Sequence, residues 1–252
     1  MKRSFVIVTF LLFCTTLNAS SITIVAEDAG SGILRIGYQI TEVTRSPVCF
    51  SLDLSLDNNA TFESIIYANP AFPIYPGSVT IDPAGVITDY GSPVAPADDI
   101  GAVGQLGDSA ITIEMGVPLV PHQVDLEFPE PRDINFDGLV DNMDMAVFVD
   151  DWLEDMAKFT DLNHDGFVNF ADYAILVDPA PPVPMSGVLL LLQLSGNPQT
   201  STNVFLTDNL YRGCYLNDGS PFDVSERISV VIPEPAMILL LTLGGIILRK
   251  SR

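Results

Sequence analysis

Two twelve-residue segments with the same arrangement of oxygen-bearing side chains constrain this chain more than any other feature of its sequence. They begin at Asp133 and Asp161 and read DINFDGLVDNMD and DLNHDGFVNFAD. Each has a carboxylate or amide at positions 1, 3, 5, 9 and 12 and a glycine at position 6. One loop with this spacing can wrap a hard cation such as Ca²⁺. A single segment could be an ordinary Asp/Asn-rich turn, whereas two matches favour two calcium sites.

The loop positions predict the ligands of each site. In the first loop, the five side chains and the position-7 carbonyl come from Asp133, Asn135, Asp137, Leu139, Asp141 and Asp144. In the second loop, they come from Asp161, Asn163, Asp165, Phe167, Asn169 and Asp172. Val140 and Val168 at position 8 are expected to pair the two loops through a short β-bridge. His164 at position 4 is expected to point away from the metal.

The sequence around the loops predicts a helix after each loop but none before the first. Pro129 and Pro131 exclude a helix there, residues 143–154 are helix-compatible, and residues 171–177 predict a shorter helix that Pro179 ends. This loop–helix, linker, loop–helix order resembles a type I dockerin module over residues 133–178. Asp at position 12, where a full EF-hand has Glu, is common in that family.

The dockerin resemblance implies a protein-binding role with a cohesin-type partner. In that family the two positions after loop position 9 influence partner choice. Here they are Asn142, Met143, Phe170 and Ala171. The alternative is that these residues only cap and pack the helices.

The first 20 residues have the order of a secretory signal peptide. Lys2 and Arg3 precede an apolar run at residues 5–14 and a small polar stretch, so cleavage is expected after Ala19 or Ser20. Cys14 raises a lipoprotein alternative, but Phe13 is bulky for the position before a lipidated cysteine.

Residues 232–252 resemble a PEP-CTERM sorting signal. The triplet Pro233, Glu234 and Pro235 precedes an apolar run at residues 237–248 and a basic tail. As a helix this run would span ~18 Å, short of a hydrocarbon core of ~30 Å. The resemblance implies a Gram-negative source, transient inner-membrane anchoring, processing by an exosortase, and final location at the cell surface or outside the cell. The alternative is a plain tail anchor.

The chain is strongly acidic, with a formal charge of −21 from 11 basic and 32 acidic residues. The two end segments hold five of the basic residues and one acidic residue, so the part between them is near −25. This charge makes nucleic acid and anionic lipid unfavourable partners. If Cys14 leaves with the signal peptide, Cys49 and Cys214 remain, and an oxidising compartment would allow them to form a disulfide.

Most of the remaining chain has the alternation of short β-strands separated by turn residues. In the strand at residues 48–57, Val48, Phe50, Leu52, Leu54 and Leu56 face one way, and Ser51, Asp53, Ser55 and Asp57 the other. Further strands are predicted at residues 32–40, 61–68, 78–82, 110–115, 187–195, 203–207, 213–218 and 228–232. The prediction is a mainly β chain, folded as an immunoglobulin- or cohesin-like β-sandwich.

The strands after the calcium loops are too few and too apolar to be stable alone. We therefore expect one discontinuous sandwich at residues 21–120 and 185–231, with an inserted dockerin-like module at residues 121–184 whose core is 133–178. Proline-rich stretches on both sides act as stiff spacers. The alternative is two modules in tandem followed by a disordered tail.

The strand pattern resembles a cohesin or carbohydrate-binding module, which implies a surface for protein or polysaccharide. Tyrosines that could stack on sugars are Tyr38, Tyr67, Tyr75, Tyr90 and Tyr215. No nucleophile motif or zinc cluster is recognisable, because the chain has two histidines and few cysteines. We expect a non-catalytic, exported, calcium-binding assembly or adhesion protein. The alternative is a glycan-binding or small glycoside-hydrolase-type protein in polysaccharide degradation.

Overall fold

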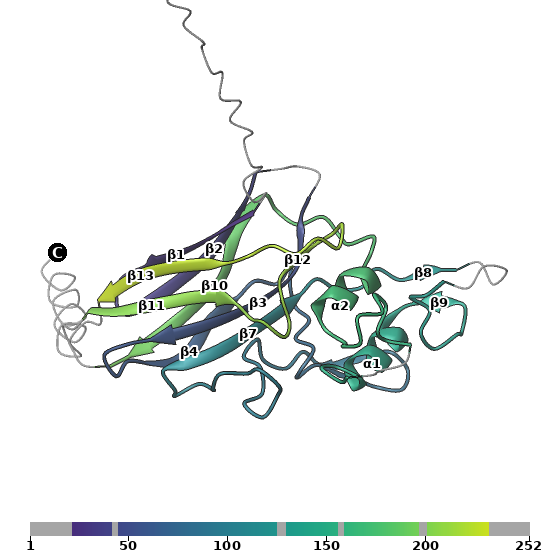
Figure 1. Cartoon of the computed structure of the whole chain (residues 1–252), viewed down its shortest axis with the longest axis horizontal. Coiled ribbons are helices and arrows are strands. Elements are labelled where there is room, and N and C mark those ends of the chain that lie inside the picture. The colour runs from purple at the N-terminus through teal and green to yellow at the C-terminus, as the bar shows by residue number, and fades with distance from the viewer. Residues whose placement is uncertain (1–21, 42–44, 125–129, 156–158, 197–200, 232–252) are drawn as a thin grey trace, which may run out of the picture.

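The computed structural model describes residues 22–41, 45–124, 130–155, 159–196 and 201–231 (Figure 1). Over these residues the protein is mainly β, with several antiparallel sheets and two short helices. The strands are β1 (Ile22–Asp28), β2 (Ile33–Ile40), β3 (Pro47–Leu56), β4 (Thr61–Ala68), β5 (Thr80–Ile81), β6 (Ile87–Asp89), β7 (Ala110–Gly116), β8 (His122–Gln123), β9 (Leu139–Val140), β10 (Ser186–Ser195), β11 (Ser201–Asp208), β12 (Tyr215–Leu216) and β13 (Ser225–Val231). The helices are α1 (Asn142–Asp150) and α2 (Phe170–Leu176).

Strands from before and after the two loops share the same sheets. The four-stranded sheet has the order β1-β2-β10-β4, so the late strand β10 lies between two early strands. In the five-stranded sheet, β7 pairs with one edge of β3, while β11 and β12 pair with the other, and β13 extends the sheet beyond β11. The early strands therefore depend on β10 and β11 for their hydrogen-bond partners.

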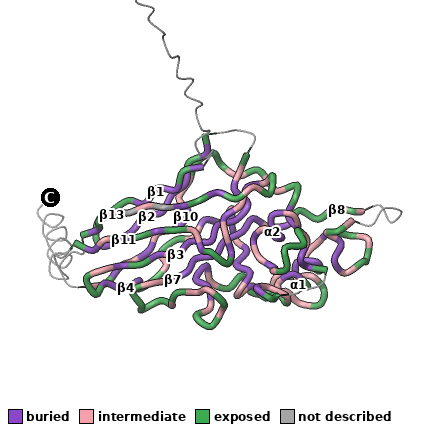
Figure 2. Tube along the Cα trace, viewed as in Figure 1, coloured by how far each residue is buried: buried purple, intermediate pink, exposed green. Residues whose placement is uncertain are grey.

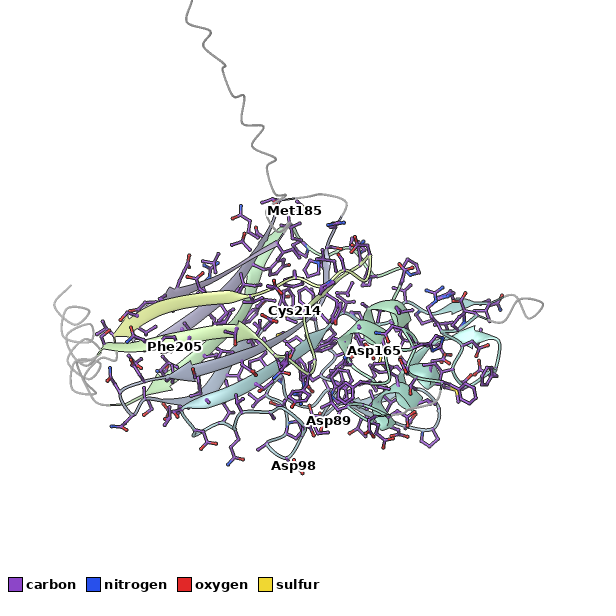
Figure 3. The ribbon with its side chains drawn as sticks, viewed as in Figure 1. Asp89, Asp98, Asp165, Met185, Phe205 and Cys214 are labelled. Carbon is purple, nitrogen blue, oxygen red and sulfur yellow. The ribbon has the colours of Figure 1, made fainter. Side chains whose placement is uncertain are left out.

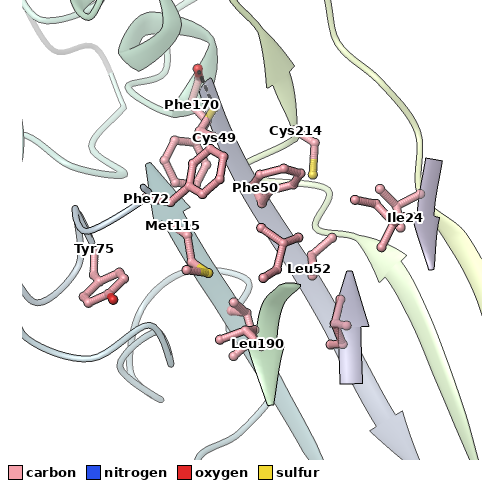
Figure 4. Close-up of a cluster of buried hydrophobic side chains, with 14 of the residues drawn as sticks. Ile24, Cys49, Phe50, Leu52, Phe72, Tyr75, Met115, Phe170, Leu190 and Cys214 are labelled. Carbon is pink, nitrogen blue, oxygen red and sulfur yellow. Dashed lines mark hydrogen bonds between the residues drawn. The ribbon is translucent and has the colours of Figure 1, made fainter. Parts of the chain in front are cut away.

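One continuous cluster of buried apolar residues includes both large sheets and extends into both helices (Figures 2 and 4). Its centre is aromatic: the Phe50 and Phe72 rings meet edge to face with centroids 5.0 Å apart, and Tyr38 contacts both. From β10, the fully buried Leu190 and Leu192 join this cluster. The helices are thus part of the same core as the sheets.

The predicted alternation of β3 holds, but its second face is partly covered. Phe50, Leu52 and Leu54 are buried in the core, and Ser55 on the opposite face is exposed. On that same opposite face, however, Cys49 and Ser51 are also fully buried. At Cys49, α2 covers the start of β3, with the thiol 3.7 Å from the Phe170 carbonyl oxygen (Figure 4). At Ser51, the segment before β12 covers the strand, and the Ser51 N–H donates to the Cys214 sulfur at 3.3 Å.

The prediction of a mainly β chain is confirmed, with differences at the ends of elements. The helices end earlier than expected, at Asp150 and Leu176. Strand β1 was not predicted, although the alternation of residues 22–26 is visible in the sequence. In the described part of the chain, no helix has both the length and the apolar character needed to cross a bilayer. The predicted signal peptide and sorting signal, including Ala19, Pro233, Glu234 and Pro235, lie outside the described residues.

Candidate metal centre

The first loop (residues 133–144) is closed by carboxylates that accept hydrogen bonds from its own backbone. Asp133 at position 1 accepts from the N–H groups of Asp137 and Gly138, both at 3.0 Å. Asp144 at position 12 accepts from Ile134 at 2.7 Å and, through its other oxygen, from Asp141 at 2.8 Å. Positions 1 and 12 therefore hold the beginning, middle and end of the loop together.

The second loop (residues 161–172) repeats this arrangement position by position. Asp161 accepts from the N–H groups of Asp165 at 3.1 Å and Gly166 at 2.9 Å. Asp172 accepts from Asn163 and Asn169, both at 3.0 Å. Two segments that share a spacing in the sequence thus share one hydrogen-bonded fold.

The backbone angles explain why position 6 is glycine. Gly138 and Gly166 have φ values of +90° and +94°, in the region that favours glycine. Position 4 is also left-handed, with φ of +62° at Phe136 and +61° at His164. Both position-4 side chains are exposed, as expected for His164.

Each loop ends in the N-terminal cap of the helix that follows it. Asp141 and Asn169 at position 9 cap α1 and α2 by accepting from the N–H groups two residues later. Asp144 and Asp172 complete the two capping boxes by bonding back to the cap residues. A ligand that fixed positions 9 and 12 would therefore also fix the start of each helix.

Both position-12 carboxylates, of Asp144 and Asp172, are buried. Burial raises the pKa of Asp144 above its usual value and that of Asp172 to about 6, against the opposing effect of the backbone hydrogen bonds. Among the described residues, the ion pairs with Arg involve none of the predicted loop ligands. Buried carboxylates of this kind favour a neighbouring cation, which stabilises their ionised form.

The donor set fits calcium in residue type, order and turn geometry. Oxygen donors alone are what a hard cation selects, and each loop offers carboxylates, an amide at position 3 and a main-chain carbonyl at position 7. Within the described ranges, no three or more His, Cys, Asp or Glu side chains are gathered closely enough to hold a metal ion by themselves. The carboxylate oxygens face backbone N–H groups, so a bound cation would have to share or replace these bonds.

The expected β-bridge between the two loops is wrong. Position 8 of the first loop pairs with β8, where Val140 lies opposite His122. Position 8 of the second loop exchanges hydrogen bonds with the turn after α1: Val168 accepts from Leu153 at 3.0 Å and donates to Glu154 at 3.1 Å. In both loops, position 8 therefore pairs with a segment that precedes the loop in the chain.

The four residues expected to contact a protein partner lie near the sheets of the same chain. Phe170 is completely buried, and its N–H donates to the Arg212 carbonyl at 3.3 Å. At the start of α1, a methyl group added to Gly85 of the β5–β6 turn would lie 3.1 Å from Met143 Cγ and 3.7 Å from Asn142 Cβ. Ala171 is half-buried. In this conformation Phe170 has no surface left for a separate protein.

Arg212 joins the second loop to the five-stranded sheet, and sequence reasoning did not identify it. Its carbonyl holds the start of α2, while its fully buried guanidinium donates to Glu114 of β7 at 3.0 Å and to the Ile100 carbonyl at 2.8 Å. Burial raises the pKa of Glu114, although the Arg212 charge opposes this effect. The only signal in the sequence was a rare basic residue in an acidic chain.

Tyr215 and Tyr173 are further contacts of the loop–helix segment. Tyr173 of α2 is buried and donates its hydroxyl hydrogen to the Val117 carbonyl. Burial raises the pKa of Tyr215 to about 12, helped by Cys49 and by the second-loop carboxylates Asp165 and Asp172.

The disulfide considered for Cys49 and Cys214 is not formed, and the tyrosines considered for sugar stacking differ in exposure. Cys49 and Cys214 are buried free thiols, and Cys214 donates to the Ser51 carbonyl at 3.3 Å while Cys49 lies against Phe170. Of the other tyrosines considered for sugar stacking, Tyr38 and Tyr75 are buried, and Tyr67 and Tyr90 are exposed.

No protein-family model matches this chain, and no curated protein matches it.

Proposed function

We propose that this protein is an exported, calcium-binding, non-catalytic assembly or adhesion protein of the cell surface or extracellular matrix. The observation that carries this proposal is the position-by-position repetition of one oxygen-lined loop fold, with buried carboxylates that lack a basic partner in the described ranges. Calcium supplies structure rather than chemistry here, because both loops continue directly into capped helices.

The metal would be held by the oxygen atoms at loop positions 1, 3, 5, 7, 9 and 12. In the first loop these belong to residues 133, 135, 137, 139, 141 and 144, and in the second to residues 161, 163, 165, 167, 169 and 172. Bound calcium neutralises the buried carboxylates and fixes the two helix starts.

The proposed architecture is a β-sandwich interrupted by a dockerin-like module. The position of β10 between β2 and β4 supports it, as does the pairing of β11 with β3. A signal peptide and a C-terminal sorting segment deliver the chain through the inner membrane to the outside. The acidic surface suits a protein that remains soluble and selects basic partners.

Isothermal titration calorimetry on the full mature protein tests the calcium sites. We expect two calcium ions per chain, with Asp133→Ala and Asp161→Ala each removing one. His164→Ala is the matched control, because this residue belongs to the second loop but does not line it with oxygen. Absence of calcium uptake by the unmodified protein would contradict the proposal.

Mass spectrometry of the protein from its native source tests the route of export. We expect the mature protein to begin after residue 19 or 20 and to lack residues 237–252. Glu234→Ala is expected to accumulate a longer, membrane-bound form. Recovery of an intact peptide covering residues 237–252 from the exported pool would show a permanent tail anchor instead.

A further inference from the structure

Two phenylalanines form an exposed apolar surface where the two loops approach each other. Phe136 and Phe159 are 64% and 65% exposed, and their rings meet edge to face with centroids 5.3 Å apart. Next to them is a recess of about 140 Å³. Its lining consists of Pro131, Ile134, Phe136, Phe159, Leu162 and His164.

This surface is costly for a protein that uses it only for packing. Phe136 occupies a left-handed backbone position, which is unfavourable for a bulky side chain and costs on the order of 1 kcal/mol or more. Its ring then lies mostly in water instead of in the core. Exposed apolar surface beside a recess is typical of an interaction site.

The volume of the recess limits what can enter it. An apolar cavity of ~150 Å³ accommodates a benzene molecule, so a recess of about 140 Å³ matches one aromatic or branched aliphatic side chain. The neighbouring Phe136 and Phe159 rings supply apolar contact for the atoms that remain outside.

The charge around the recess determines what must flank that side chain. Residues 130–172 contain twelve Asp and Glu residues against Arg132 and Lys158, so two bound calcium ions still leave about six negative charges. A second copy of this chain and an anionic membrane are both negatively charged, so this segment would repel them. A segment with Lys or Arg beside its apolar residue has the complementary sign.

We propose that the Phe136–Phe159 recess binds a protein segment that presents one aromatic or branched aliphatic side chain flanked by basic residues. This inference rests on the proposed assembly function and identifies the surface that would bind the partner. Of the residues that the dockerin resemblance assigns to partner binding, Phe170 is completely buried in the core of the same chain. The recess is built from the loops, Pro131 and Phe159, and the Phe136 and Phe159 rings beside it remain exposed.

Fluorescence anisotropy with three labelled synthetic peptides tests this proposal on the full mature protein in ~1 mM calcium. The first peptide carries a central Phe flanked by Lys, the second replaces Lys by Glu, and the third replaces Phe by Ser. We expect only the first to bind. The double change Phe136→Ser and Phe159→Ser is expected to weaken its binding at least tenfold. Phe205→Ser on β11, far from Asp165 in Figure 3, is the matched control and should leave binding unchanged.

Three results would overturn the proposal. The first is no binding of the Phe/Lys peptide, and the second is binding that the double variant retains, which would indicate general attraction to acidic surface. The third is light scattering that shows a dimer for the unmodified protein and a monomer for the double variant. This result would mean that the recess binds a second copy of this chain. Calcium titration of the double variant distinguishes this proposal from the proposed calcium-binding function. The variant should still bind two calcium ions although it no longer binds the peptide.

Discussion

The two loops have the same internal structure and different surroundings. Both close on carboxylates at positions 1 and 12, and both cap the helix that follows. The second loop continues into a helix whose Phe170 and Tyr173 are buried against the five-stranded sheet. The first continues into a helix whose buried Phe148 packs on Tyr173 of α2, with ring centroids 5.8 Å apart, and whose start lies against the β5–β6 turn at Gly85.

This difference shows how a repeated element can acquire two roles. A loop whose helix packs directly on a large sheet links calcium binding to the stability of that sheet. A loop whose helix reaches the large sheets through a second helix can change its own order with less effect on them. We therefore expect calcium in the second loop to stabilise the whole chain, and calcium in the first loop to act locally.

The largest expected effect comes from removing the side chain that fixes the second helix. Phe170→Ala should destabilise the protein by about 3–5 kcal/mol, because it opens a cavity between α2, Trp152 and the start of β3. Phe136→Ala is the same chemical change on the exposed surface of the first loop and should stay within ~0.5 kcal/mol. Denaturant unfolding followed by far-ultraviolet circular dichroism measures both. Equal losses would remove the proposed distinction between the loops.

Calcium removal should also separate the loops. At a hundredfold excess over its dissociation constant, calcium stabilises a folded protein by ~2.7 kcal/mol, provided that the unfolded chain does not bind it. Asp161→Ala should therefore lower the temperature at which the sheets unfold. It should also abolish most of the effect that a chelator has on this temperature. Asp133→Ala should leave that effect nearly intact. Differential scanning calorimetry with and without chelator checks this, and the reverse ranking would mean that the first loop is coupled to the sheets.

The buried thiols provide a reporter of helix docking. Burial raises the pKa of both Cys49 and Cys214, so little thiolate forms at neutral pH in the folded protein. Cys49 is covered by Phe170 and should become exposed when α2 leaves the sheet, whereas Cys214 lies against Ser51. We expect a chelator or Asp161→Ala to raise the labelling rate of Cys49 at least tenfold, and Asp133→Ala to have little effect. Labelling in Cys49→Ser and Cys214→Ser variants assigns the rates. Equal acceleration of both thiols would indicate global unfolding.

The sequence predicted the parts of this molecule that depend on local spacing. The two loops carry their glycine and oxygen positions in the sequence, and the strands β3 and β10 carry an alternating and a continuous apolar pattern, respectively. The mainly β fold follows from these patterns. The helix ends were less well predicted, because the capping residues at position 9 begin the helices one residue earlier than expected.

What the sequence could not predict are contacts between distant segments. The local sequence does not distinguish whether position 8 of a loop pairs with position 8 of the other loop or with another segment. The pairing of Val140 with His122 therefore depends on the tertiary arrangement. Arg212 shows the same limit, because its role comes from Glu114 and Phe170, about 100 and 40 residues away in the sequence. Whether a loop stands apart or belongs to the core is decided by such contacts.

The smallest expected effect concerns the β8–β9 pairing that holds the first loop. The Val124 N–H donates to the Gly138 carbonyl at 3.2 Å, and Val124→Pro removes this donor. One hydrogen bond is worth about 1 kcal/mol, so the first loop should bind calcium a few times more weakly, while the second loop and the sheets keep their stability. Calorimetric titration of Val124→Pro in the Asp161→Ala background isolates the first site, and Val124→Ala is the matched control because it keeps the N–H group. A fall in the melting temperature of the sheets comparable to that of Asp161→Ala would show that the first loop is coupled to the sheets as strongly as the second, and the contrast between the two loops would then be lost.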